Sequence, residues 1–211
     1  MQMPAVQNTR RVARNAVIVA ALATVGGVGV SRLRARKADA AVAPQATAAA
    51  TADQPRIMVS LSDRKLTIID GEDTQTYGVA VGRDSKPTPT GNFKIRKIVW
   101  NPAWVPPDEK WAKGKAPQPP GAAKNPMKLV KIFFKEPDYY IHGTGEVESL
   151  GEAASHGCLR MDPDDAYQVA KYLMDHGGQP RDESWFSRVL HFRDETKTVY
   201  LDHPIPMTVT E

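Results

Sequence analysis

The single cysteine of this 211-residue chain, Cys158, closes the tetrapeptide Ser155-His156-Gly157-Cys158. A thiol attacks an acyl group as its thiolate, so a reactive cysteine needs a base and amide donors for the oxyanion. Gly157 lets the backbone approach a substrate carbonyl, and a helix expected just after Cys158 offers its positive end. We expect both features to favour the thiolate, and the pattern indicates covalent acyl chemistry.

Two histidines near the cysteine in sequence, His142 and His156, are candidate bases, and spacing alone does not choose between them. The same residues could ligate zinc, but a fourth ligand with recognisable spacing is missing, so we expect neither a metal nor another cofactor. Taken alone, one cysteine and one histidine are equally compatible with an inert buried thiol. The residues around them must therefore decide.

The paired motifs Tyr140-Ile141-His142-Gly143-Thr144 and Ser155-His156-Gly157-Cys158-Leu159-Arg160 resemble the L,D-transpeptidase catalytic domain, also called the YkuD domain. Three further blocks support this: Thr88-Pro89-Thr90-Gly91-Asn92-Phe93-Lys94-Ile95, Asn125-Pro126-Met127 and Pro204-Ile205-Pro206-Met207. The resemblance covers about residues 56–211.

The resemblance assigns roles to individual residues. It implies that Cys158 is the nucleophile and that His142, not His156, accepts its proton. It also implies that the Gly143 carbonyl orients the His142 ring, while amides around His156, Gly157 and Cys158 form the oxyanion hole. His156 then becomes an orienting residue.

Two polar side chains of the second motif are expected at the substrate site. Ser155 is predicted to hydrogen-bond within the loop and to line the substrate-binding region. Arg160 either binds a substrate carboxylate or forms a salt bridge with Asp162 or Asp165 at the start of the following helix.

The resemblance implies that the cysteine is acylated by a peptidoglycan tetrapeptide stem, that D-Ala leaves, and that an amine resolves the thioester. The acceptor is a second stem, a lysine of an outer-membrane protein, or water. Two rivals remain open: a cysteine hydrolase such as a carboxypeptidase, amidase or papain-like protease, and a wall-binding protein without activity.

The first 40 residues have the layout of a signal peptide: arginines, the uncharged stretch Ala16–Val30, and a small-x-small site at Ala38-Asp39-Ala40. The Arg10-Arg11 pair resembles a twin-arginine signal more than a Sec signal. We therefore expect a signal peptide or signal anchor over 1–40, an Ala-rich linker over 41–54 and a catalytic domain over 55–211. The domain is expected in the periplasm, with membrane contact only through an uncleaved N-terminus.

The charge distribution argues against nucleic-acid binding. Residues 1–40 contain seven of the 28 basic residues and one of the 24 acidic residues, which leaves 21 basic and 23 acidic residues for 41–211. A mildly acidic domain lacks the cationic surface that phosphates require.

Apolar residues alternate in many short segments, so we predict a mostly β fold, an L,D-transpeptidase-like β-sandwich of mixed sheets. Strands are expected at 57–61, 66–68, 77–81, 93–99, 129–134, 139–142, 189–192 and 199–201. One principal α-helix follows the cysteine, with Asp162 as N-cap, Pro163 at its first position and Gly177-Gly178 at its end. Residues 100–127, rich in Pro and Trp, are predicted to be a loop that forms a lid or groove wall.

Overall fold

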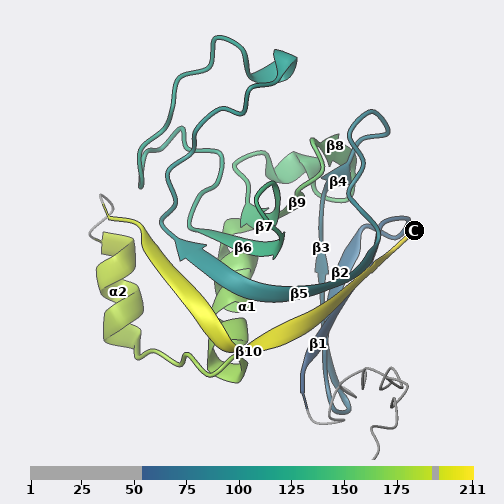
Figure 1. Cartoon of the computed structure of the whole chain (residues 1–211), viewed down its shortest axis with the longest axis vertical. Coiled ribbons are helices and arrows are strands. Elements are labelled where there is room, and N and C mark those ends of the chain that lie inside the picture. Colours follow the sequence, from purple (N-terminus) through teal and green to yellow (C-terminus); the bar gives the residue numbers. More distant parts are fainter. Residues whose placement is uncertain (1–53, 192–194) are drawn as a thin grey trace, which may run out of the picture. The chain divides into compact units, whose positions relative to one another are not determined.

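Strands are the commonest regular element of the structure, a computed structural model that describes residues 54–191 and 195–211 (Figure 1). The expected signal segment 1–40 and the linker 41–54 lie outside these residues, except for Gln54. In chain order the elements are β1 Arg56–Ser60, β2 Lys65–Asp70, β3 Asp73–Gly78, β4 Val81–Gly82, β5 Gly91–Trp100, η1 Lys110–Ala112, β6 Val130–Lys135, β7 Tyr139–Gly143, η2 Val147–Ser149, β8 Ala153–Ser155, β9 Leu159–Met161, α1 Pro163–His176, α2 Glu183–His191 and β10 Lys197–Thr210.

One sheet of eight strands, in the order β3-β2-β1-β10-β5-β6-β7-β9, forms the framework. The pairs β1–β10 and β7–β9 are parallel, and the other neighbours are antiparallel. A second, two-stranded sheet joins β4 to β8. Figure 1 shows the long strands β5 and β10 running side by side through the middle of the domain. The prediction of a mostly β domain with mixed sheets is confirmed.

The helix after the cysteine forms as expected. The Asp162 carboxylate accepts the Asp164 backbone N–H at 2.9 Å, and Pro163 occupies the first helical position, where no N–H is required. The apolar side chains at helical spacing are buried against the sheet: Ala166, Val169, Ala170, Leu173 and Met174. Helix α1 therefore packs its apolar side on the sheet, in contact with β6, β7 and β10.

A second helix replaces one predicted strand. The prediction of a strand over 189–192 was wrong, because Val189 lies in α2, and Phe192 is outside the described residues. Asp182 Oδ1 accepts the Trp185 backbone N–H at 2.8 Å, and Phe186 and Val189 are buried at helical spacing. Among the described residues, neither helix has the length and apolar character needed to cross a membrane.

Three strand boundaries also differ from the prediction. The expected strand 77–81 is divided, because β3 ends at Gly78 and Val81 begins β4. Strand β3 is largely exposed and polar, so apolar alternation did not reveal it. Strand β10 is much longer than the predicted 199–201, since the chain continues past a register shift between Tyr200 and Ile205.

Candidate active site

The register between β7 and β9 brings the two motifs together. His142 lies opposite Arg160 and Ile141 opposite Leu159 in this parallel pair. One step back along both strands, Cys158 falls beside Tyr140. Because side chains alternate between the faces of a sheet, these two pairs share the face opposite Ile141 and Leu159, whose side chains are buried in the core.

The loop that carries Cys158 is held by Ser155. Its hydroxyl donates to the Cys158 carbonyl at 2.5 Å and accepts the Gly157 N–H at 3.0 Å. Ser155 is only 1% exposed, and its hydroxyl holds the loop through these two bonds, as the sequence predicted. The Gly157 N–H, expected at the oxyanion, is therefore engaged within the loop.

Gly157 cannot be replaced without strain. Its φ is +109°, and an added Cβ would lie 2.8 Å from Tyr139 Cε1. Gly143 is also restricted, since a Cβ there would lie 3.0 Å from Cα of Pro163, at the start of α1. The two motif glycines thus permit close packing on both sides of the site.

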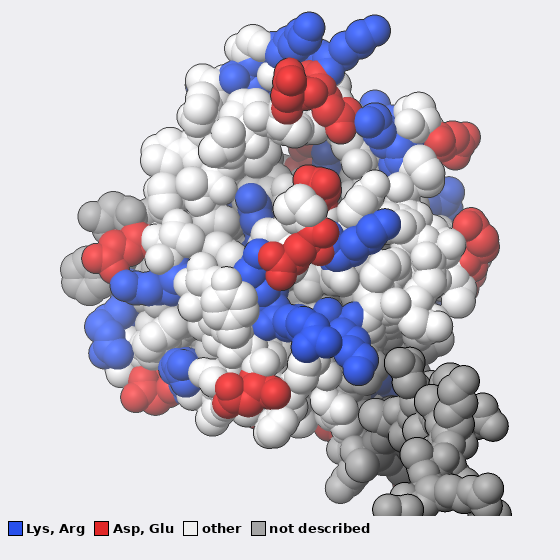
Figure 2. All heavy atoms as spheres, in the orientation of Figure 1, with Lys and Arg blue, Asp and Glu red and all other residues white. Residues whose placement is uncertain are grey.

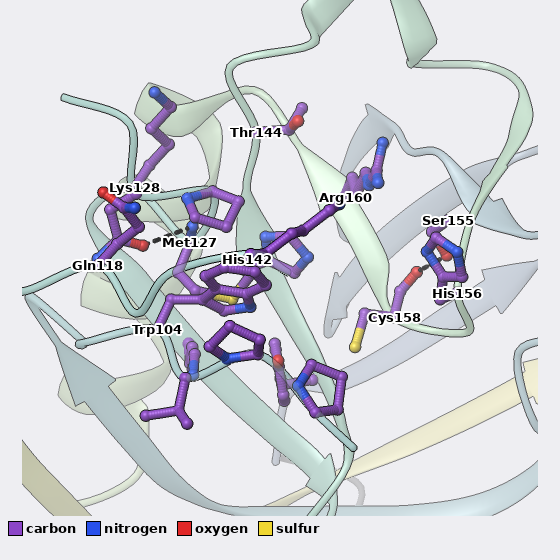
Figure 3. Close-up of a pocket in the computed structure, with 18 of the residues that line it drawn as sticks. Trp104, Gln118, Met127, Lys128, His142, Thr144, Ser155, His156, Cys158 and Arg160 are labelled. Atoms are coloured by element: carbon purple, nitrogen blue, oxygen red, sulfur yellow. Dashed lines mark hydrogen bonds between the residues drawn. The ribbon is translucent and has the colours of Figure 1, made fainter. Parts of the chain in front are cut away.

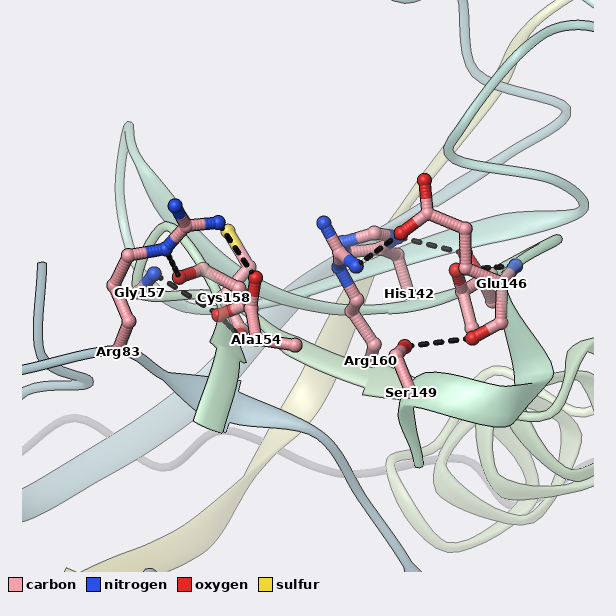
Figure 4. Close-up of polar contacts among 11 residues, drawn as sticks. Arg83, His142, Glu146, Ser149, Ala154, Gly157, Cys158 and Arg160 are labelled. Atoms are coloured by element: carbon pink, nitrogen blue, oxygen red, sulfur yellow. Dashed lines mark hydrogen bonds and ion pairs between the residues drawn. The ribbon is translucent and has the colours of Figure 1, made fainter. Parts of the chain in front are cut away.

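The His142 ring is fixed by a backbone contact. Nδ1 lies 2.7 Å from the Gly143 carbonyl, the contact that the resemblance implied, and Figure 4 shows it. This contact favours the tautomer with hydrogen on Nδ1 and a lone pair on Nε2. Burial lowers the pKa of His142 to about 4, and the Gly143 carbonyl opposes this shift. The imidazole is therefore neutral at neutral pH.

Cys158 is also uncharged in the resting structure. Burial raises the pKa of its thiol to about 11, although the Tyr140 amide and Lys131 favour the thiolate. The Sγ donates to the Asp138 carbonyl at 3.3 Å. Loss of hydration outweighs the favourable charges, so the resting thiol is neutral even though the loop glycine and the helix start were expected to favour the thiolate.

A groove of about 1090 Å³ contains both candidate groups, and Figure 3 shows Cys158 and His142 within it. The 100–127 loop forms one wall of the groove, and a groove wall is one of the two roles predicted for it. Trp104 and Gln118 exchange backbone hydrogen bonds of 2.9 and 2.8 Å, and the Trp111 ring stacks on His156 with centroids 3.9 Å apart. Among the described residues, no group of three His, Cys, Asp or Glu side chains is placed to hold a metal ion.

The groove is positively charged. Seven of its lining residues are basic and three are acidic. Two of the acids, Glu109 and Glu146, are paired with Lys86 and Arg160, each at 2.7 Å. Figure 2 shows Lys and Arg side chains interspersed with Asp and Glu side chains over one face of the molecule. Carboxylate-bearing ligands therefore suit this groove.

A sequence model of the L,D-transpeptidase catalytic domain (YkuD) matches residues 54–196, more than half of the chain. The chain belongs to the L,D-transpeptidase catalytic-domain family. Both motifs of the groove, with His142 and Cys158, fall within the matched residues.

Individual L,D-transpeptidase relatives agree with this assignment. YkuD of Bacillus subtilis is 30% identical over 118 residues, covering 56% of this chain and 59% of YkuD. YqjB of the same organism is 31% identical over 119 residues, covering 54% of this chain and 64% of YqjB. Both relatives are named L,D-transpeptidases by assignment. This chain covers less than two thirds of the length of each.

Among solved structures, an L,D-transpeptidase from Mycobacterium smegmatis is similar at a TM-score of 0.48 and 15% identity, covering 75% of this chain and 59% of that one. L,D-transpeptidase 3 from Mycobacterium tuberculosis gives 0.44 and 15%, covering 74% and 62%.

Two arginines of the L,D-transpeptidase domain have defined contacts. Arg160 pairs with Glu146 and not with Asp162 or Asp165, so that part of the prediction was wrong (Figure 4). The reason is direction: Arg160 points into the groove, whereas the aspartates lie at the helix start. Arg83, which the sequence did not single out, donates to the carbonyls of Ala154 at 2.8 Å and Ser155 at 3.2 Å.

Three other groups around the sulfur escaped sequence reasoning: Lys131, Asp138 and Tyr140. Asp138 acts through its backbone carbonyl, which no residue pattern reveals. Tyr140 and Lys131 could have been found, because Tyr140 is two residues before His142 on a strand and Lys131 interrupts the apolar run 129–134.

Proposed function

We propose that the protein is an L,D-transpeptidase that uses Cys158 as nucleophile and His142 as general base. One observation carries the proposal: the only thiol opens on the same groove as an imidazole whose Nδ1 is fixed by the Gly143 carbonyl. This is the arrangement that nucleophilic catalysis by a Cys-His pair requires.

The acylation half-reaction begins with the thiol turning from the Asp138 carbonyl toward His142 Nε2. The S–H bond breaks, its proton passes to Nε2, and the sulfur pair attacks the carbonyl carbon of the stem's third residue at its L-centre. The tetrahedral intermediate then expels the D-Ala amine, which takes the proton from His142. A thioester on Cys158 remains.

The resting pKa values constrain this step. Values of about 11 for Cys158 and about 4 for His142 make proton transfer before substrate binding unfavourable by on the order of 10 kcal/mol. A turnover of about 10 per second corresponds to a barrier of roughly 16 kcal/mol, so this cost is tolerable. It favours proton transfer that accompanies attack over a preformed ion pair.

The developing oxyanion needs backbone donors near the sulfur. The Gly157 N–H is engaged by Ser155, so the amides of Cys158 and His156 are the best placed of the residues that the resemblance implied. The His156 ring stacks on Trp111, so the 100–127 loop helps to hold these amide donors in place.

The groove charge supports an acidic stem as substrate. After the pairs with Glu109 and Glu146, the remaining basic lining residues face only one acid, Asp138. A second stem that supplies an amine would yield a cross-link, an outer-membrane protein lysine would yield anchoring, and water would yield trimming.

The test is incubation of the purified full-length chain with disaccharide-tetrapeptide, followed by mass spectrometry. A cross-linked dimer that lacks one D-Ala, absent with Cys158→Ala, is the expected result. Tripeptide alone would identify a carboxypeptidase. Identical products with Cys158→Ala would contradict the proposed nucleophile.

We further propose that residues 1–40 direct the domain to the periplasm. A fusion of residues 1–45 to a reporter that folds before export is expected to reach the periplasm by the twin-arginine route. Export that survives replacement of both Arg10 and Arg11 by Lys would argue against that route, and a reporter retained in the cytoplasm would argue against export.

A further inference from the structure

Lys131 lies on β6 directly opposite His142 on β7. Burial alternates along β6, with Val130, Ile132 and Phe134 in the core and Lys131 on the other face. Lys131 therefore shares the face of His142, and both line the groove with Cys158.

The ammonium group of Lys131 has no carboxylate partner within residues 54–191 and 195–211. Its Nζ lies 4.8 Å from the Tyr140 ring centroid and 3.4 Å from the Ala103 carbonyl. By contrast, Lys97 on the neighbouring strand is paired with Glu136, and Arg160 with Glu146. Lys131 is thus a half-buried cation whose charge is not neutralised locally.

The charged and titratable groups around the sulfur come from several elements. They are Lys131 from β6, Tyr140 and His142 from β7, Arg160 from β9 and Asp138 from the turn before β7, with Lys97 of β5 behind Lys131. Among the cations, Lys131 acts more strongly than Arg160 on Cys158, whereas Arg160 acts more strongly than Lys131 on His142. Since Glu146 also offsets Arg160, Lys131 is the stronger and the less neutralised of these two cations at the sulfur.

We propose that Lys131 is a positioning residue for the reaction, held over the Tyr140 ring so that its ammonium stabilises the anionic sulfur when Cys158 loses its proton. The inference rests on the proposed function, because it takes Cys158 as the nucleophile. Burial opposes the thiolate, and Lys131 offsets part of that penalty without touching the substrate. Tyr140 supports this role, because its ring holds the ammonium group of Lys131 in place.

The test measures the thiolate directly, with iodoacetamide and the full-length chain. The sulfur forms a bond to the methylene carbon and iodide leaves, so the rate follows the thiolate fraction and needs no peptidoglycan. Lys131→Met is expected to reduce the alkylation rate at about pH 8 by roughly tenfold, the effect of raising the thiol pKa by about one. Lys131→Arg is expected to retain most of the rate.

Lys135 provides a matched control. It lies on the same strand with its Nζ 5.3 Å from the Tyr139 ring centroid, but it is not part of the groove lining. Lys135→Met removes the same charge from an equivalent lysine-tyrosine contact and is expected to leave alkylation unchanged. Lys131→Gln provides a second neutral variant, with a polar side chain, should Lys131→Met fail to fold.

The pH profile separates an electrostatic role from a merely structural one. Burial lowers the pKa of Lys131. The difference between wild type and the neutral variants should be largest at neutral pH and should shrink as pH rises and Lys131 loses its proton. Equal alkylation rates in wild type, Lys131→Met and Lys131→Gln would overturn the proposal, even if their KM for the stem rose. If alkylation changes as expected while no stem reacts, the inference stands and the proposed substrate fails.

Discussion

Ser155→Ala tests whether the buried serine supports the loop or contacts a substrate. The substitution removes the hydroxyl that donates to the Cys158 carbonyl at 2.5 Å and accepts the Gly157 N–H at 3.0 Å. It leaves the other side chains of the groove unchanged. A supporting role predicts a loss of stability, whereas a substrate contact predicts a change in KM alone.

The size of the effect follows from the burial of these partners. Two hydrogen bonds contribute about 1 kcal/mol each, and a buried N–H left unpaired raises the penalty further. Ser155 is 1% exposed and Gly157 is buried, so we expect a loss of about 2–3 kcal/mol. For a domain of this size, that corresponds to a Tm lower by roughly 5–10 °C.

Thermal denaturation followed by circular dichroism measures this loss, with Ser149→Ala as control. Ser149 also donates its hydroxyl to a backbone carbonyl, that of Glu146 at 2.6 Å, but at the exposed surface. Its replacement should cost less than about 0.5 kcal/mol. If Ser155→Ala is no less stable than Ser149→Ala, the reasoning is refuted. A raised KM at unchanged stability would favour the substrate-binding role.

Three further outcomes are expected. The pKa of His142 is about 4 in the folded chain against 6.5 ordinarily, so protonation of this histidine favours the unfolded chain. The contribution of the neutral imidazole to folding stability is complete above about pH 6.5, and about 3 kcal/mol is lost as pH falls through about 4. Acid denaturation curves of His142→Gln should show a smaller loss. Gly157→Ala should lower transpeptidation at least about tenfold, because the new Cβ meets Tyr139. Gly151→Ala, also at positive φ but with open space around it, should not lower it. Equal activities of the two variants would contradict the packing argument. A carbapenem should add one acyl adduct to the intact mass of the wild type and none to Cys158→Ala; an adduct on both would exclude Cys158 as the acylated group.

Much of the fold follows from local sequence signals. Alternation at Ile57, Val59, Leu66 and Ile68 predicts the β1–β2 hairpin that forms, and the Asp162 cap predicts the start of α1. These predictions succeed because the hydrogen bonds and apolar spacing that determine them lie within a few residues of one another.

Elements that depend on distant partners were less predictable. Strand β10 contains Pro204 and Pro206, which resemble a strand end, yet Pro206 lies opposite Lys94 because β5 supplies the pairing across the long strand. Strand β3 forms from polar residues because β2 offers a pairing edge. The short apolar run at Val189 resembles a strand when taken alone, but the whole of α2 has its apolar residues at helical spacing, and Phe186 and Val189 are buried.

The sequence by itself determined the family and the reactive residue types, since adjacent residues define the motifs, and the family resemblance implied the contact between His142 and Gly143. Only the tertiary structure decided the state of the sulfur and which charges act on it. The register of β6, β7 and β9 brings Lys131 and Tyr140 to Cys158, and burial makes the thiol neutral. Hydration and charge at a site depend on everything packed around it, and those neighbours are distant in the chain.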